Sequence, residues 1–302
     1  MSTAIDRAGE LTTMVAGPMR HGLIDHMWRF ARRQPVGFAA ALVILITALV
    51  AIFAPVVAPY DPLQIHRGRS LEAPSREFWL GTDDLGRDVF SRIVYGARVS
   101  LQVGLIAVTA GTLVGALVGL TTGYWGGLYD LLLQRVIDAI QAFPGLVLAL
   151  AIASALEPGL RNSMIAVAIL LIPGAARLTR GVTLSAKEQQ FVEATRAMGA
   201  SDLRILALHI VPNIFPPVLV LASIVVGAAI LIEASLGFLG LGVPPPAASW
   251  GSMLSGAGRQ FFVQAPWLAI APGVAIGLLV LSFNLFGDAL RDAIDPKLRG
   301  SR

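Results

Sequence analysis

The residue types that usually carry chemistry are sparse in this sequence and form no arrangement typical of an active site. There are no cysteines, so disulfides and thiolate metal sites are excluded. The two lysines, Lys187 and Lys297, do not follow a glycine, so the chain has no G-x-x-x-x-G-K-[ST] loop to hold ATP phosphates. No two of the four histidines stand at metal-ligand spacing on one predicted helix; they are His21, His26, His66 and His209. We therefore expect no enzymatic activity, metal ion or cofactor on this chain itself.

Three charged residues lie in or beside apolar segments, where a charged side chain is energetically costly and is usually paired or functional. Glu233 follows fifteen uncharged residues, 218–232, and would either line a transport path or outer gate, or bond to neighbouring helices. Arg135 and Asp138 precede another apolar segment. They could form an inner gate, contact a cytoplasmic partner, or pair with each other at the membrane interface. The sequence leaves these alternatives open.

The composition indicates an integral membrane protein that is helical throughout. Of 302 residues, 55% are hydrophobic and 14% are charged, whereas soluble domains contain about 25% charged residues. A spanning helix needs about 20 apolar residues. We predict six spans, near 37–57, 101–123, 139–156, 162–176, 218–236 and 267–286. The fourth is short, and Arg177 and Arg180 would lengthen it by reaching to the interface.

Lysine and arginine set the orientation of the spans. With the N-terminus inside, the inner segments hold 15 positive residues and the outer ones 8, six of which lie beside six acidic residues in the loop 58–100. Both termini are therefore predicted to be cytoplasmic, and the dispersed positive charge gives no reason to expect nucleic acid as a partner. The predicted parts are a cytoplasmic segment 1–36, a first helix and outer loop 37–100, a five-helix core 101–287 and a cytoplasmic tail 288–302.

Local patterns predict further details of the spans. Gly111, Gly115 and Gly119 recur every four residues, which is typical of a helix-packing face. Pro144-Gly145 and Pro173-Gly174 predict breaks in two successive spans, either kinks around a cavity or sites of close packing. Residues 84–99 are predicted to form a short amphipathic helix on the outer surface.

The longest cytoplasmic connection, 177–215, has the pattern of two short helices joined by a glycine. A first helix over 186–198 would place an apolar stripe on one face, made of Phe191, Ala194 or Thr195, and Met198. Gly199 stands where a left-handed residue ends a helix.

The second helix of this connection is predicted over 203–210. Ser201 or Asp202 could cap its start, and Pro212 would stop it. The plain alternative is a solvated loop that only joins two spans. A connection needs only a few residues, however, and an apolar stripe favours docking into a groove on a partner protein.

Within this connection, Glu193-Ala194-Thr195 is followed after three residues by Gly199 and, after nine more, by His209-Ile210-Val211-Pro212. This spacing resembles the EAA loop of permease subunits in bacterial ATP-binding-cassette importers. Thr195 and His209 stand where that pattern prefers alanine and isoleucine. Residues 81–104, 233–251 and 283–300 are also similar to the dipeptide, oligopeptide and nickel branch of that family.

The resemblance implies the fold and partners of that family. It implies a six-helix type I importer domain in the bacterial inner membrane, namely the second, shorter ("C"-type) permease. It also implies a second permease subunit, two ATPase subunits that hold ATP and Mg²⁺, and an extracytoplasmic solute-binding protein. The ATPase subunits would dock on residues of the EAA loop, which are Phe191, Glu193, Ala194, Thr195, Met198, Gly199, Ser201, Asp202 and Pro212.

The sequence therefore predicts a translocation subunit that moves di- or oligopeptides, or a similar small solute, and draws energy from ATP hydrolysis by its partners. Membrane lipid would surround it. The alternative from another class is a self-sufficient secondary transporter or channel. That alternative requires inverted repeats and ionisable residues near the membrane midplane, and we find neither in the sequence. A membrane-embedded hydrolase is disfavoured because no histidine lies inside a predicted span.

Overall fold

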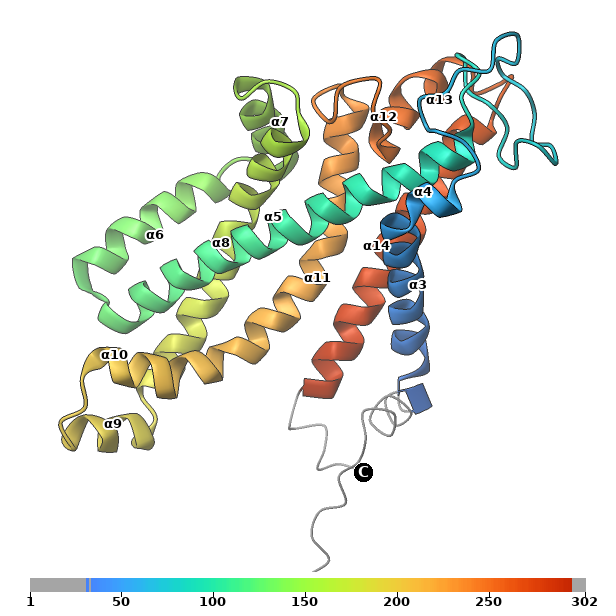
Figure 1. The fold of residues 1–302 in the computed structure, drawn as a ribbon. Helices are drawn as coiled ribbons and strands as arrows, with labels where there is room; N and C mark the ends of the chain where they lie inside the picture. Colours follow the sequence, from blue (N-terminus) through green and yellow to red (C-terminus); the bar gives the residue numbers. More distant parts are fainter. Residues whose placement is uncertain (1–30, 33, 295–302) are drawn as a thin grey trace, which may run out of the picture.

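A computed structural model describes residues 31–32 and 34–294, and this part of the chain is helical apart from its connecting loops (Figure 1). The helices are α3 (Pro35–Ile52), α4 (Ala54–Val57), α5 (Val89–Trp125), α6 (Gly127–Gln141), α7 (Gly145–Ala155), α8 (Leu160–Lys187), α9 (Gln190–Ala197), α10 (Asp202–Ile205), the π-helix η1 (Leu206–Ile210), α11 (Val211–Phe238), α12 (Trp250–Ser255), α13 (Ala257–Gln260) and α14 (Trp267–Ile294). The predicted all-α fold is confirmed.

Five helices are long and apolar enough to cross a membrane: α3, α5, α8, the continuous helix Asp202–Phe238 made of α10, η1 and α11, and α14. The pair α6 and α7, bent by 92° at the break between them, is apolar enough for a sixth span when the two helices are counted as one. This agrees with the six predicted spans. The buried core lies where α5, α8, α11 and α14 meet, and it contains Val103, Val167, Ile230 and Leu279.

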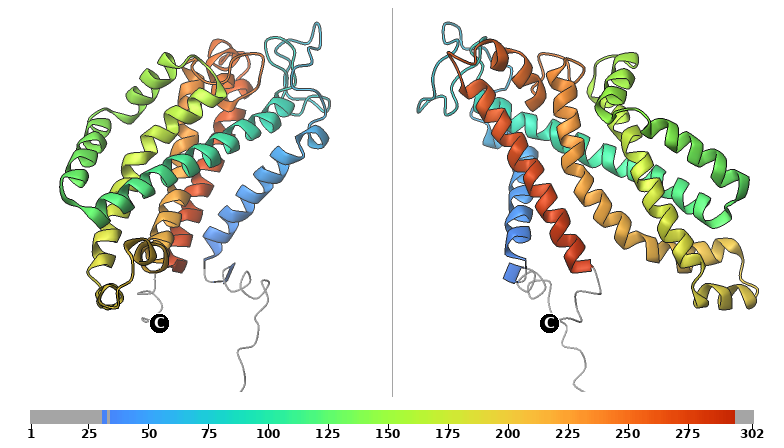
Figure 2. Two further views of the ribbon diagram at one scale, coloured as in Figure 1. Left: turned by 60° about the vertical axis from the view of Figure 1, so that its left-hand side comes forward. Right: turned by 180° about the vertical axis from the view of Figure 1, so that it is seen from behind.

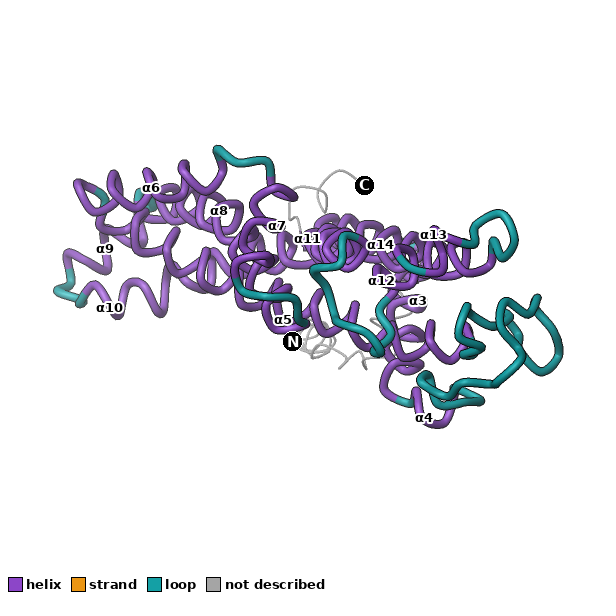
Figure 3. Tube along the Cα trace, turned by 90° about the horizontal axis from the view of Figure 1, so that it is seen from above, coloured by secondary structure: helices purple, strands orange, loops and turns teal. Residues whose placement is uncertain are grey.

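The two ends of the helix bundle carry different elements. The α9–α10 hairpin lies at the same end as the start of α3 and the end of α14 (Figures 1 and 2). The loop 58–88 and the short helices α12 and α13 lie at the opposite end. Seen from above, the helices form an elongated array rather than a ring, with the hairpin and the loop 58–88 far apart (Figure 3). The predicted segment 1–36 and tail 288–302 lie largely outside the described residues.

Helix α5 begins earlier than predicted, because charged residues near its start find protein partners. The predicted surface helix 84–99 is the first part of α5 rather than a separate element. Asp88 caps α5 by accepting a hydrogen bond from the N–H of Ser91 at 2.8 Å. Arg98 donates to the backbone oxygen of Ala51, near the end of α3, at 2.5 Å. The prediction of a separate helix over 84–99 was therefore wrong.

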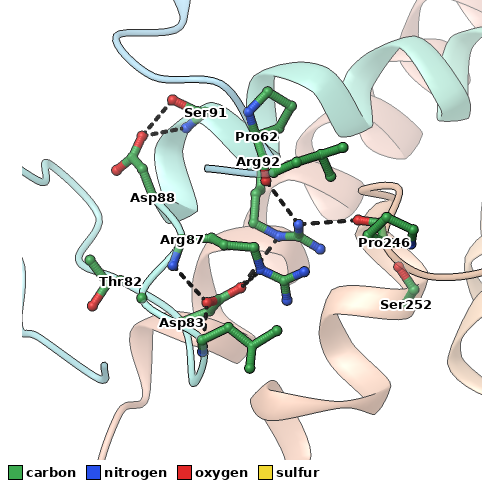
Figure 4. A network of polar contacts seen from close by, with 12 residues as sticks. Pro62, Thr82, Asp83, Arg87, Asp88, Ser91, Arg92, Pro246 and Ser252 are labelled. Carbon is green, nitrogen blue, oxygen red and sulfur yellow. Dashed lines mark hydrogen bonds and ion pairs between the residues drawn. The ribbon is translucent and has the colours of Figure 1, made fainter. Parts of the chain in front are cut away.

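A buried polar network fastens the outer loop 58–88 to the start of α5 (Figure 4). Arg92 is 6% exposed and donates to the backbone oxygens of Pro62 at 3.1 Å and Pro246 at 3.4 Å. The carboxylate of Asp83 lies 3.6 Å from the same guanidinium. One arginine thus joins the outer loop, α5 and the connection that follows α11.

Helices α5 and α8 cross very closely along the glycine stripe. A β-carbon on Gly111, Gly115 or Gly119 would lie 2.2 to 2.4 Å from a backbone oxygen of α8. That is shorter than any van der Waals contact, so only glycine permits this approach. The predicted packing face is confirmed.

The two proline-glycine pairs behave differently. Pro144 is exposed and stands at the start of α7, where the span bends as predicted. Pro173 is buried inside α8, which continues without a break from Leu160 to Lys187. Beside Pro173, the backbone oxygen of Ile172 lies against Gly115 of the glycine stripe, so α8 packs closely on α5 here. The second predicted break was therefore wrong.

Candidate functional site

The predicted helix–glycine–helix hairpin is present, although its first helix is shorter. Helix α8 takes up the first predicted residues, so α9 begins only at Gln190. Gly199 has a φ of +82°. Its N–H bonds to the oxygen of Arg196 at 2.9 Å, and the N–H of Ala200 bonds to the oxygen of Thr195 at 3.3 Å. These two bonds form a Schellman motif, whose left-handed residue favours glycine.

The start of the second helix is not capped as predicted. Ser201 occupies the N-cap position of α10, but its side chain makes no cap hydrogen bond. The carboxylate of Asp202 instead accepts a hydrogen bond from the hydroxyl of Tyr124 at 2.5 Å. The hydroxyl of Tyr124, at the end of α5, therefore binds the carboxylate that we predicted as a possible helix cap.

Pro212 does not stop the helix. It lies in the first turn of α11 within the continuous helix that ends at Phe238. The five-residue π-helix η1 precedes it, and the N–H of Val211 bonds to the oxygen of Leu206. A regular turn would press the proline ring against a carbonyl one turn back, and the wider π turn relieves this clash. The prediction of a helix end here was wrong.

The hairpin rests on a buried apolar base. Val192 of α9 and both Ile205 and Ile210 of the second arm are fully buried. They pack with Tyr124, which is 3% exposed at the end of α5, and with Leu206. Sequence reasoning missed Tyr124. An aromatic residue at the end of an apolar run, as expected at a membrane interface, was the available signal.

The opposite face of the hairpin is apolar and exposed. Phe191, Met198 and Leu203 are 43%, 80% and 75% exposed. Glu193 and Ala194 are exposed beside them, and the partly buried Thr195 donates its hydroxyl to the oxygen of Phe191 at 2.7 Å. The fold therefore gathers the predicted stripe residues on a free face at the tip of the molecule.

Glu233 is buried between helices. It is 1% exposed, and Ser100 of α5 donates to its Oε2 at 3.3 Å. Its Oε1 has no hydrogen-bond partner in the described part of the chain. Across residues 31–32 and 34–294, no group of three or more His, Asp or Glu side chains is placed to hold a metal ion.

Asp138 pairs across helices rather than with Arg135. Its carboxylate accepts from Arg177 of α8 at 2.7 Å. A second pair joins the same two helices, because Asp130 accepts two hydrogen bonds from Arg180, at 2.7 and 2.6 Å. Arg177 and Arg180 thus fasten α8 to α6. The Arg135–Asp138 pair, one of the alternatives that the sequence left open, is not formed.

We expect the two ion pairs to contribute unequally to stability. The side chains of Arg177 and Asp138 are 51% and 49% exposed, and exposed pairs contribute about 0.2–1 kcal/mol. Asp130 is only 16% exposed and its pair is bidentate. Asp130→Asn should therefore lower the thermal unfolding temperature in detergent more than Asp138→Asn does. Equal shifts in the two melting curves would contradict this ranking.

Comparison with known proteins gives matches along nearly the whole chain. Residues 111–300 match the family described as "Binding-protein-dependent transport system inner membrane component". Residues 22–74 match "N-terminal TM domain of oligopeptide transport permease C". In a solved structure of the MetNI methionine ABC transporter in inward-facing conformations, one chain aligns with a TM-score of 0.55 at 19% identity, covering 68% of this chain and 97% of that one. This likeness supports the fold.

Two curated relatives are much more similar in sequence. The chain is 46% identical over 276 residues to the dipeptide transport system permease protein DppC of Alkalihalophilus pseudofirmus, covering 90% of each protein. It is 47% identical over 274 residues to the glutathione transport system permease protein GsiD of Escherichia coli O6:K15:H31, again covering 90% of each. With its apolar spans, the chain is a multi-pass inner-membrane protein and belongs to the family of inner-membrane components of binding-protein-dependent transport systems.

Proposed function

We propose that the chain is the second, C-type permease subunit of an ATP-driven importer of peptides, and that its ATPase subunits dock on the hairpin 186–212. The two relatives are named for dipeptide and glutathione transport, and both cargo molecules consist of amide-linked amino acids. That shared chemistry supports a small peptide as cargo. The observation that carries the docking proposal is the exposed apolar face on an ordered, buried base.

The exposed side chains of the hairpin indicate a missing partner surface. Burying a methionine or leucine side chain contributes about 1.5–3 kcal/mol. In the isolated chain, Met198 and Leu203 lack most of this stabilisation because they are 80% and 75% exposed. A short helix that presents such residues suits a hydrophobic groove. Glu193, in the first turn of α9, would add a charge at the edge of that contact.

Energy would enter this chain from its partners. The sequence has no loop of the type that cradles ATP phosphates, so ATP and Mg²⁺ are assigned to two separate ATPase subunits. The complex would include a second permease subunit and an extracytoplasmic solute-binding protein. Closure of the ATPases can move this chain only if their two states favour different hairpin positions. Helix α8 ends at the hairpin and α11 leaves it, so such movement would reach two spans directly.

We also propose that Arg135, Asp138 and Glu233 act in the translocation path or its gates. A pocket of about 340 Å³ lies at the α6–α7 bend, lined by Ile140, Gln141, Phe143, Gly145, Leu148, Leu170 and Pro173. Asp138 lies three residues before Gln141 on α6, which also contributes to the lining. Arg135 is exposed and makes no ion pair with any described residue, which leaves its guanidinium for a partner or a cargo carboxylate. Glu233 would require helix movement to become accessible.

Single-cysteine labelling tests the docking proposal and the orientation together. Because the sequence contains no cysteine, Met198→Cys introduces a single thiol. A membrane-impermeant thiol reagent should label it only from the cytoplasmic side, and the ATPase subunits should protect it and cross-link to it. The matched control is Val263→Cys, since Val263 is 94% exposed at the opposite end. It should be labelled from outside, with or without ATPases.

Two results would count against the proposal. One is labelling of Met198→Cys from the outside only. The other is equal labelling of this thiol with and without the ATPase subunits, with no cross-link formed. Peptide uptake by the chain reconstituted alone would instead support the self-sufficient transporter.

A further inference from the structure

We propose that Tyr124 is the joint that makes the hairpin and the α5–α8 pair move as one body. It is a positioning residue, and the inference rests on the proposed docking function. Tyr124 is 3% exposed at the last turn of α5. Its backbone oxygen and its hydroxyl bind residues on either side of α9, namely Lys187 at the end of α8 and Asp202 at the start of α10.

The end of α8, which leads into the hairpin, is held through the backbone of Tyr124. Lys187, the last residue of α8, donates from its ammonium to the backbone oxygen of Tyr124 at 2.6 Å. The same ammonium lies 5.5 Å from the centre of the tyrosine ring. Carbonyls in the last turn of a helix lack intrahelical partners and attract cations. Lys187 therefore ties the end of α8 to the end of α5.

The second arm is held through the side chain of Tyr124. Its hydroxyl donates to the carboxylate of Asp202, the first residue of α10, at 2.5 Å. A hydrogen bond to a charged acceptor is stronger than one between neutral groups. Ile205 and Ile210 pack in the same buried cluster as the tyrosine. Tyr124 thus bridges the end of α8, which leads into the hairpin, and the start of the hairpin's second arm.

The chain offers several places where motion of the hairpin could be absorbed locally. Helix α8 stops before α9 begins, Gly199 forms a left-handed turn, and the π-helix η1 interrupts the regular ladder. Helix α5 is not adjacent to the hairpin in sequence, because it turns into α6 at Gly126. Non-covalent contacts alone connect it to the hairpin. The hydrogen bond from Tyr124 to Asp202 adds a direct contact between α5 and the second arm. A displacement of the hairpin therefore moves α5 with it instead of only bending the turns between α8 and α11.

The test measures cargo imported per ATP hydrolysed by the complete transporter in proteoliposomes. Tyr124→Phe removes only the hydroxyl and should lower this ratio about tenfold, which corresponds to about 1.4 kcal/mol and lies near the lower end of the range for a hydrogen bond to a charged group. Tyr129→Phe is the matched control. Tyr129 lies in the first turn of α6 and is exposed, and its hydroxyl bonds to Thr121 at 3.1 Å. Its ratio should equal that of the unmodified chain.

Protection of the thiol in Met198→Cys separates failure of the joint from failure of docking. If Tyr124→Phe keeps ATPase protection of this thiol and loses cargo per ATP, the joint is supported. If protection is kept and the ratio is unchanged, the joint is refuted and the docking proposal stands. If the variant assembles in membranes but loses protection, the tyrosine shapes the docking surface, and its role as a transmission joint is refuted.

A double-mutant comparison adds a readout that a general packing role would not produce. If Tyr124 and Asp202 act through their mutual hydrogen bond, the double variant Tyr124→Phe/Asp202→Ala should transport no less per ATP than the worse single variant. If the loss of cargo per ATP in the double variant equals the product of the two single losses, the two residues act separately and the joint is refuted.

Discussion

Replacing Gly119 by leucine is expected to prevent the chain from forming a stable bundle. A β-carbon at this position would lie 2.2 Å from the backbone oxygen of Ala176 and 2.8 Å from the backbone nitrogen of Arg180. Neither is the end of a flexible side chain, so the helices would have to separate. Overpacking in a well-packed core costs about 1–3 kcal/mol, occasionally more, and this contact is among the tightest in the described chain. We expect little folded protein by size-exclusion chromatography in mild detergent.

The matched control for this variant is Gly181→Leu. Gly181 lies on α8, close in sequence to Arg180, but a β-carbon there meets no atom within 4 Å. Both variants insert leucine for glycine in a helix of the same pair, so they change hydrophobicity and helix propensity alike. Gly181→Leu should yield folded protein at the unmodified level. Similar yields from the two variants would mean that the α5–α8 crossing is not set by the glycine stripe.

The glycine stripe shows which features a sequence predicts well. Spans and packing faces follow from the period of the helix and from composition, and both are local properties of the sequence. The same locality explains the Schellman turn at Gly199, because a left-handed turn needs no distant partner. The helical fold, the six spans and the hairpin were predictable for this reason.

The errors share a different physical cause. The segment 84–99 was predicted as a separate helix, but it is the first part of α5, where Arg98 binds a backbone oxygen at the end of α3. Asp138 was expected to pair within its own helix, but Arg177 approaches it from α8. Tyr124 was not recognised because its partner Asp202 is 78 residues away in sequence. Each of these contacts joins elements distant in the chain, and a single sequence carries no direct record of such neighbours.

Replacing Gly199 by valine is expected to lower peptide uptake by roughly tenfold while the chain still inserts in the membrane. Gly199 has a φ of +82°, and a left-handed conformation costs a residue with a β-carbon about 1–2 kcal/mol, most for β-branched side chains. Space is not the obstacle, since a β-carbon there meets nothing within 4 Å. The strain would instead open the Schellman turn and rotate α9, which moves Met198 and Phe191 away from their docking positions. Uptake by reconstituted transporter, normalised to the amount of this subunit, measures the loss.

The matched control for this variant is Gly240→Val. Gly240 also has a φ of +82°, has free space around its β-position, and ends α11 in the same kind of turn, with Leu241 bonded to Leu236 at 2.9 Å. It lies at the opposite end of the bundle, so the substitution applies equal backbone strain away from the hairpin. Co-purification of the ATPase subunits should fall with Gly199→Val and remain unchanged with Gly240→Val. Equal loss from both variants would attribute the effect to general destabilisation and would contradict a specific role for the hairpin.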